Sequence, residues 1–191
     1  MAILVRGGTV LVDAGATPAS LDVLVDGDRV VRVERGLEAP AGARVIDATN
    51  RLVMPGFVNG HTHAHNNLAR AAMDGLPLEI WVQYLAARVA NRTPRDIYVG
   101  AAVGAMEMLR TGSTCACDMA QVTPWPTDEA LDAVARAYAD VGLRASIAAQ
   151  VFDLSFVESV AGLEAMLPAD LRAAVAKRGP YPGDEVLATI R

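Results

Sequence analysis

The chain has 191 residues, of which 52% are hydrophobic and 5% are aromatic, and its formal net charge is −5 at pH 7. This composition is typical of a well-packed globular protein, and the acidic balance argues against nucleic acid as a partner, because phosphate binding needs clustered Lys and Arg. The first residues lack a signal-peptide pattern and no apolar run approaches the roughly twenty residues that span a bilayer, so we expect a cytoplasmic protein without a membrane partner.

Residues 1–53 predict a small N-terminal β-domain. Short strands are expected at 3–5, 9–12, 22–25 and 29–33. Asp26-Gly27-Asp28 between two apolar runs indicates a hairpin, since glycine takes positive φ without steric cost. The pattern is that of a β-meander or half of a β-sandwich.

From Met54 onward, strands alternate with helices. Strands are predicted at about 52–60, 112–119 and 143–152, and helices from about 78, from 93 to 111, from 127 to 142 and from 155. Thr93 and Thr127 stand at typical helix starts, and Gly112 and Gly142 at typical helix ends. This order predicts parallel β/α units.

Residues 54–191 therefore predict an α/β fold, namely about the first three β/α units of a (β/α)8 TIM-type barrel. A closed barrel needs eight strands and about 250 residues, so we expect the N-terminal part of a longer enzyme. Its edge strands and helix faces lack neighbours, which predicts a homo-oligomer or association with a missing C-terminal half.

All three histidines lie on alternate residues at the end of the first predicted barrel strand. Alternate side chains of a strand point to the same side, so His61 and His63 can converge on one metal ion. Neutral imidazole is the commonest metal ligand, although a histidine on an apolar face can also be an ordinary core residue. His65 lies past the expected strand end, where a contact to a ligand residue or to substrate fits better than ligation.

The second predicted strand carries two cysteines and an aspartate. Cys115 and Cys117 are two residues apart on one strand, which suits small buried hydrophobes better than a disulfide or a metal role. Asp118 is expected to face the barrel mouth. With one charge and no partner visible in the sequence, it is assigned no catalytic role.

Five short segments form a distinctive set: Pro-Gly-Phe-Val-Asn-Gly-His-Thr-His at 55–63, Val-Ile-Asp-Ala at 45–48, Val-Met at 53–54, Leu-Pro-Leu-Glu-Ile-Trp at 76–81 and Gly-Ser-Thr at 112–114. This set resembles the amidohydrolase superfamily. The similarity is to its branch of cyclic amidine and amino hydrolases, which includes S-adenosylhomocysteine deaminase, guanine deaminase and the triazine hydrolases. It implies a metal-dependent hydrolase on a (β/α)8 barrel with a small β-domain.

The resemblance implies hydrolysis of non-peptide carbon–nitrogen bonds, as deamination of a cyclic amidine or heterocycle by metal-bound hydroxide. The implied cofactor is one divalent metal, with Zn²⁺ preferred and Fe²⁺ as the alternative. His61 and His63 take the places of the first two ligands, whereas the family takes its other ligands and its acid/base groups from later strands. No histidine follows His65, so no catalytic residue is identifiable and we expect the chain alone to be inactive.

The candidate substrate contacts are His65, Asn67, Glu79, Trp81 and Gln150. Asn67 lies in a polar loop, where a cap or a solvent-facing role is an equal alternative. Trp81 stands where the family commonly places a substrate-facing aromatic, although a tryptophan at helical spacing is more often packing. Ile80 replaces the ribose-binding glutamate of nucleoside deaminases, so the resemblance implies a smaller heterocyclic or amidine substrate.

Two alternatives stay open. In the first, the chain is an active short enzyme whose missing ligands come from another copy or a separate chain. In the second, it is a non-catalytic fragment that serves as a binding or structural module. Metal content separates them, because a chain that retains near one equivalent of zinc after gel filtration has a complete site.

Overall fold

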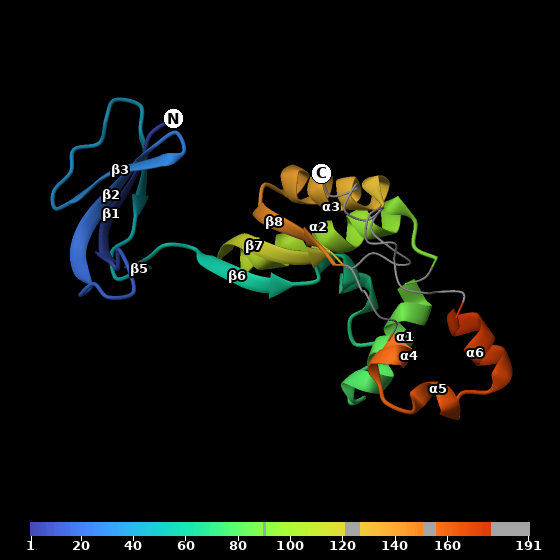
Figure 1. Ribbon diagram of the computed structural model, residues 1–191. Coiled ribbons are helices and arrows are strands. Elements are labelled where there is room, and N and C mark those ends of the chain that lie inside the picture. Colours follow the sequence, from blue (N-terminus) through green and yellow to red (C-terminus); the bar gives the residue numbers. More distant parts are fainter. Residues whose placement is uncertain (90, 121–126, 151–155, 177–191) are drawn as a thin grey trace. The chain divides into compact units, whose positions relative to one another are not determined.

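The computed structural model describes residues 1–89, 91–120, 127–150 and 156–176 (Figure 1). The chain divides into two compact units, Met1–Gly56 and Phe57–Arg191. The described elements of the first unit are all strands, and those of the second unit are strands and helices.

The first unit is built on one five-stranded sheet. Its strands are β1 (Ile3–Val10), β2 (Ala19–Asp26), β3 (Arg29–Glu34), β4 (Arg44–Asp47) and β5 (Leu52–Val53). The order is β3-β2-β1-β4, with antiparallel pairing from β1 to β3 and parallel pairing of β1 with β4 and with β5. Leu4, Leu24 and Leu37 form its small buried core.

The two strands predicted on either side of the Gly7-Gly8 pair are one strand, β1. Its pairing with β2 slips between Val5 and Gly8, so a bulge accommodates the glycines without ending the strand. Gly7 has a φ of 73°, which glycine adopts readily, and its N–H donates to the Asp22 carboxylate at 2.7 Å. The Leu37 N–H donates to the same carboxylate at 2.9 Å. The sequence pattern therefore predicted a break between two strands where the structure has a bulge within one strand.

The prediction of a single strand at about 52–60 is also wrong, because these residues form two strands in different sheets. β5 pairs with β1 of the first unit, whereas β6 (Phe57–Thr62) pairs with β7 (Ser113–Ala120) in the second unit. Pro55 lies between them and has no N–H to donate to a strand ladder. The chain therefore leaves one sheet before it enters the other.

The second unit contains a parallel three-stranded sheet in the order β6-β7-β8, with β8 at Arg144–Ala149. Figure 1 shows α2 (Pro94–Arg110) and α3 (Asp128–Val141) side by side along this sheet. Parallel strands that alternate with helices are the predicted pattern, so the mixed α/β class is confirmed.

Both of these helices begin and end at the predicted caps. The Thr93 hydroxyl accepts from the Asp96 N–H at 3.2 Å, and the Asp96 carboxylate accepts from the Thr93 N–H at 2.8 Å, which forms a capping box. The Thr127 side chain accepts from the Ala130 N–H at the start of α3. α3 ends at Gly142, whose φ of 83° is the left-handed conformation usual at this position.

The core of the second unit lies between the sheet and these helices. Its buried members are mostly small: Ala64, Ile97, Ala101, Ala105, Ala116, Ala130, Ala133, Val134, Ala137, Tyr138 and Leu143. On β7, Ala116, Asp118 and Ala120 are buried on the helix side. Cys115 and Cys117 face the opposite side, are only half-buried and have free thiols. This corrects the expectation that the cysteines are fully buried.

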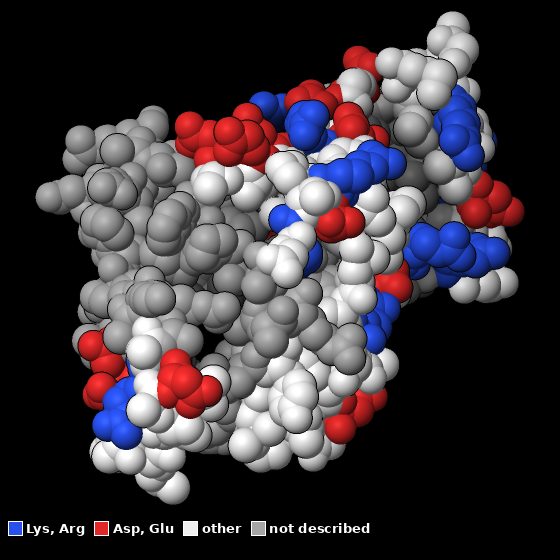
Figure 2. All heavy atoms as spheres, turned by 90° about the vertical axis from the view of Figure 1, so that its right-hand side faces the viewer, with Lys and Arg blue, Asp and Glu red and all other residues white. Residues whose placement is uncertain are grey.

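The remaining helices are short or lie outside this core. They are the 3-10 helix η1 (Ala64–Ala69), α1 (Leu78–Val89), α4 (Phe156–Ser159), α5 (Leu163–Met166) and α6 (Ala169–Ala176). No helix in the described part of the chain combines the length and the apolar character that crossing a bilayer requires. Acidic and basic side chains of the described residues are interspersed on the face drawn in Figure 2.

Candidate functional site

His61 and His63 lie at the carboxyl end of β6 with their rings close together. The ring centroids are 5.0 Å apart and the rings are nearly perpendicular, at 86°. His61 is exposed and His63 is half-buried. This separation suits two imidazoles that share one ion, because zinc–nitrogen bonds are about 2.0–2.1 Å long.

A β-bulge in β6 decides which side of the sheet these histidines face. Asn59 pairs with Ala116 and Thr62 pairs with Asp118, so β6 has one more residue than β7 over this stretch. Ala116 and Asp118 are buried on the helix side, and their partners Asn59 and Thr62 share that side. The histidines flank Thr62 and point the other way. If β6 alternated regularly from Asn59 to His63, without a bulge, the histidines would share a face with Asn59.

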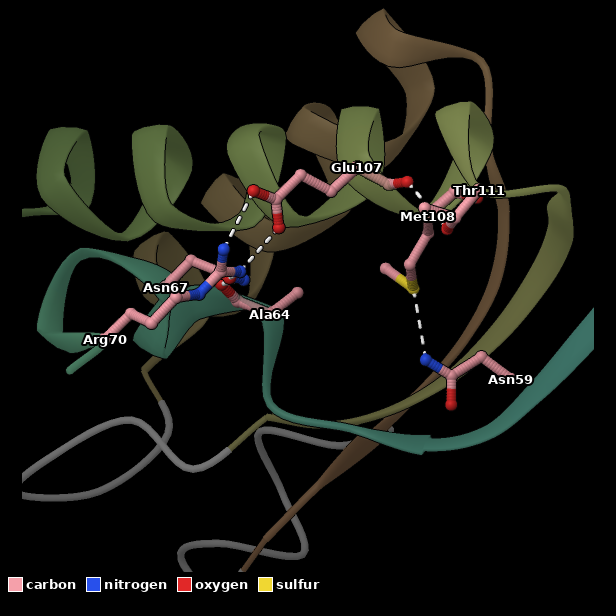
Figure 3. Close-up of polar contacts among 7 residues, drawn as sticks. All are labelled: Asn59, Ala64, Asn67, Arg70, Glu107, Met108 and Thr111. Carbon is pink, nitrogen blue, oxygen red and sulfur yellow. Dashed lines mark hydrogen bonds and ion pairs between the residues drawn. The ribbon is translucent and has the colours of Figure 1, made fainter. Parts of the chain in front are cut away.

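Asn59 bridges the bulge to α2. Its Nδ2 donates to the Met108 sulfur at 3.3 Å, as Figure 3 shows, and its Oδ1 accepts from the His61 N–H at 3.2 Å. The side chain therefore connects the helix layer to the backbone of the first candidate ligand. Sequence analysis missed this role. The available signal was an asparagine two residues before a candidate ligand, because such a side chain readily accepts from the backbone two residues on.

The ring of His63 is oriented by the backbone of the neighbouring strand. Its Nδ1 lies 2.7 Å from the Met119 carbonyl oxygen of β7. A carbonyl oxygen only accepts hydrogen bonds, so Nδ1 donates and carries the proton of the neutral ring. The lone pair of Nε2 is then available for a metal, in the arrangement usual for metal-binding histidines.

His65 is fully buried in η1, and its ring lies edge-on to that of His63, with the ring centroids 6.1 Å apart. Its Nδ1 lies 3.9 Å from Oδ1 of Asp118, and its carbonyl oxygen accepts from Arg92 at 2.7 Å. A side chain with no exposed surface does not contact substrate in this structure. Of the roles predicted for His65, its position fits contact with a candidate ligand residue rather than contact with substrate.

Asp118 does not face the barrel mouth as predicted, because it is fully buried on the helix side of β7. Its Oδ2 accepts from the Tyr138 hydroxyl of α3 at 2.7 Å. Burial raises the pKa of Asp118, while hydrogen bonds from Tyr138 and from the Ala64 N–H act in the opposite direction. Burial also raises the pKa of Tyr138, and the bond to the carboxylate adds to that shift. The partner was invisible in the sequence because Tyr138 is twenty positions away.

Asn67 lines a cavity of about 400 Å³ on the helix side of β6. The lining residues are Thr62, Asn67, Arg70, Gly104, Glu107, Met108, Arg110 and Thr111. Asn67 donates to the Ala64 carbonyl at 2.7 Å, and Arg70 bonds to both Asn67 and Glu107 (Figure 3). The histidines face the opposite side of β6, so this cavity is separate from them and these contacts brace η1 against α2.

The other candidate substrate residues lie on two further elements. Trp81 is half-buried on α1, and the side chain of Glu79 on the same helix lies outside the described part of the chain. Gln150 is half-buried directly after β8, where its N–H donates to the Ala120 carbonyl at 3.2 Å. Their contacts with substrate stay predictions.

The two imidazoles fit zinc in chemical type and in orientation. Among the described residues, however, no three His, Cys, Asp or Glu side chains are grouped so that they can hold a metal ion. A catalytic zinc site normally has three protein ligands.

Comparison with protein families decides what kind of chain carries this arrangement. A family model described as the amidohydrolase family matches residues 52–185, which include His61, His63 and the described strands β6, β7 and β8. The chain belongs to the amidohydrolase family. The resemblance based on the segment at 55–63 is thereby confirmed.

Relatives of this amidohydrolase chain include proteins named 5-methylthioadenosine/S-adenosylhomocysteine deaminase. The one from Thermococcus kodakarensis is 40% identical over 155 residues, which cover 81% of this chain and 34% of that protein. The one from Symbiobacterium thermophilum is 41% identical over 151 residues, which cover 76% of this chain and 33% of that protein. The chain spans about a third of the length of these relatives.

Solved structures of triazine-degrading amidohydrolases share the fold. Atrazine chlorohydrolase from Arthrobacter aurescens, solved in complex with zinc, has a TM-score of 0.74 and 28% identity, covering 82% of this chain and 37% of its own. A triazine hydrolase from the same genus has a TM-score of 0.75 and 27% identity, covering 85% and 39%.

Proposed function

We propose that His61 and His63 are the first two ligands of one divalent metal ion, with zinc preferred over iron. The observation that carries this proposal is the 2.7 Å contact of His63 Nδ1 with the Met119 carbonyl, with the His61 ring 5.0 Å away on the same face. Together these features leave two imidazole lone pairs available on one side of the sheet. The zinc bound to the related atrazine chlorohydrolase supports the choice of ion.

The reaction is hydrolysis of a non-peptide carbon–nitrogen bond, in the form of deamination of a heterocycle or cyclic amidine. A bound divalent cation activates water for such an attack at neutral pH. The residues of this chain hold the ion and orient its ligands. His61 and His63 bind the ion, and the Met119 carbonyl accepts a hydrogen bond from the protonated nitrogen of His63. The names of the relatives support this class of reaction, and no comparison supports the alternative of a non-catalytic module.

The substrate is a small molecule with a nitrogen-containing ring. Relatives are named for adenosine derivatives and structural neighbours for triazines, and both kinds of molecule contain such a ring. Ile80 stands where the resemblance places a ribose-binding glutamate, which favours recognition of the ring without a sugar. Glu79, Trp81 and Gln150 are its candidate contacts, whereas Asn67 lies on the other side of β6 from the histidines and is not proposed as one.

The proposed architecture is the first three β/α units of a (β/α)8 barrel in residues 54–191, after a β-domain in residues 1–53. The parallel sheet of the second unit supports it, and so does the likeness to the triazine hydrolases. In the described sheet, β6 and β8 each pair on one side only. Their outer edges suit association with further barrel strands or with a second copy of the chain.

The metal proposal is tested by zinc titration of the metal-free chain against a chromophoric chelator. We expect one zinc ion per chain, and we expect His61→Gln and His63→Gln each to raise the Kd at least tenfold, because each removes one of two ligands. Glu38→Gln is the control for nonspecific binding, since it removes an exposed carboxylate of the first unit. Zinc binding by both histidine variants with the affinity of the unmodified chain overturns the proposal.

A further inference from the structure

A buried polar cluster lies directly behind the candidate metal ligands. Asp118 has no exposed surface, accepts from the Tyr138 hydroxyl at 2.7 Å and lies 3.9 Å from Nδ1 of the buried His65. The nearby Ala64 N–H lowers the pKa of this carboxyl group, which favours its ionised form. Burying polar groups costs free energy unless they are paired, so apolar side chains would fill this space at a lower cost in free energy.

The cluster holds the chain segment that immediately follows the ligand His63. Asp118 lies 3.9 Å from Nδ1 of His65, and the next residue of β7, Met119, accepts from the His63 ring. Two residues of the ligand segment, His63 and His65, thus lie against two consecutive residues of one strand. Any displacement of residues 64 and 65 from β7 moves His63 Nδ1 away from the Met119 carbonyl.

Tyr138 fixes the position of the carboxylate from the helix layer. It is buried on α3 within the main core of the second unit, so its hydroxyl is a rigid donor. Arg92 holds the same segment at a further point, since its Nη1 donates to the His65 carbonyl at 2.7 Å and to the Asn66 side chain at 3.0 Å. The ligand segment is therefore tied to β7, to α3 and to the loop before α2.

We propose that Asp118, anchored by Tyr138, is a positioning residue that holds His63 in the ring orientation and tautomer required for metal binding. The inference rests on the proposed role of His63 as a ligand. Asp118 touches neither metal nor substrate. It acts through Ala64 and His65, whose attachment to β7 keeps Nδ1 of His63 on the Met119 carbonyl and Nε2 directed away from it.

Nitrogen NMR of the imidazoles tests this directly, because the chain contains only three histidines and their ring signals can be assigned by substitution. In the ¹⁵N-histidine-labelled chain without metal, we expect His63 to be in the Nδ1–H tautomer. In Asp118→Asn and in Tyr138→Phe, we expect it to become a mixture of tautomers. We also expect the zinc Kd to rise about tenfold or more, the usual effect of losing a partner behind a metal ligand.

A control pair of the same chemical type, a tyrosine and an aspartate, lies between α2 and α3. The Tyr98 hydroxyl of α2 donates to the Asp140 carboxylate of α3 at 2.8 Å, on the exposed side of the helix layer. Tyr98→Phe and Asp140→Asn remove the same chemical groups without touching residues 63–65. We expect both controls to leave the His63 tautomer and the zinc Kd unchanged.

The outcomes separate this inference from the proposed function. Folded Asp118→Asn and Tyr138→Phe chains, verified by circular dichroism, with the tautomer and zinc Kd of the unmodified chain overturn the positioning role. If Asp118→Asn does not fold, Tyr138→Phe decides, because it removes a single oxygen atom. A tautomer change in the variants, together with no zinc binding by any form of the chain, supports the positioning of His63 and overturns its role as a ligand.

Discussion

Asn59 shows how a single side chain outside the ligand set shapes the site. Its amide spans the distance from Met108 on α2 to the His61 N–H. Replacement by alanine removes both contacts, and we expect Asn59→Ala to raise the zinc Kd severalfold while lowering the free energy of unfolding by only about 0.5–1.5 kcal/mol. Chelator competition and urea melts measure the two effects, with the exposed Asn91→Ala as control. A loss of stability without any change in Kd would limit Asn59 to a structural role.

Residue-scale reasoning from the sequence succeeded where the rule is local. His61 and His63 share a face because alternation along a strand holds over two residues. Asp118 was assigned to the wrong face because two longer-range features decide there: which face of β7 the helices cover, and a hydrogen-bond partner on α3. The sequence contains no local signal for either.

At the scale of elements, the close packing of η1 against α2 depends on a glycine. A Cβ added at Gly100 would lie 2.5 Å from the His65 carbonyl oxygen, which belongs to rigid backbone. Alanine favours a helix over glycine by about 1 kcal/mol, but this contact outweighs that gain. We therefore expect Gly100→Ala to destabilise the chain by about 1–3 kcal/mol and to weaken zinc binding.

Ala102→Gly on the same helix is the control for helix propensity, because it makes the reverse change at a half-buried position. We expect it to lower the free energy of unfolding by about 1 kcal/mol and to leave the zinc Kd unchanged. A more stable Gly100→Ala chain in thermal melts would show that propensity prevails and that η1 can move.

The boundaries of the helices were the structural features most readily predicted from the sequence. Thr93, Thr127 and Gly142 carry their signals in one or two residues, and the structure has the caps where those signals stand. Strand boundaries were less predictable, because the apolar run from 52 to 60 looks continuous while hydrogen bonding divides it between two sheets. Which sheet a strand joins depends on partners far along the chain.

At the scale of the whole molecule, one buried carboxylate makes the stability of the first unit depend on pH. Hydrogen bonding by the Gly7 N–H lowers the pKa of Asp22 below its ordinary value. The folded state then binds the proton less readily than the unfolded chain, so this stabilisation is present above the unfolded pKa of about 3.9 and is lost as pH falls through the lower folded pKa. The loss belongs to the first unit.

Asp22→Asn tests this, and the tryptophans make the two units distinguishable because both lie in the second unit, at 81 and 125. At pH 7 we expect the variant to lose about 1–3 kcal/mol in urea melts followed by far-UV circular dichroism. The difference from the unmodified chain should shrink below about pH 3. We expect the tryptophan fluorescence transition to stay in place, and an equal shift in both signals would contradict independent units.

The bulge in β6 allows this strand to differ in length by one residue. Deletion of Gly60 would leave one residue, His61, between Asn59 and Thr62, which matches the one residue between their partners Ala116 and Asp118 on β7. Regular alternation would then keep both imidazoles on the face opposite Asn59 that they occupy now, so the site would retain its geometry without the bulge. Among related sequences, a one-residue gap at this position is therefore compatible with the same pair of histidines on the same face of the strand.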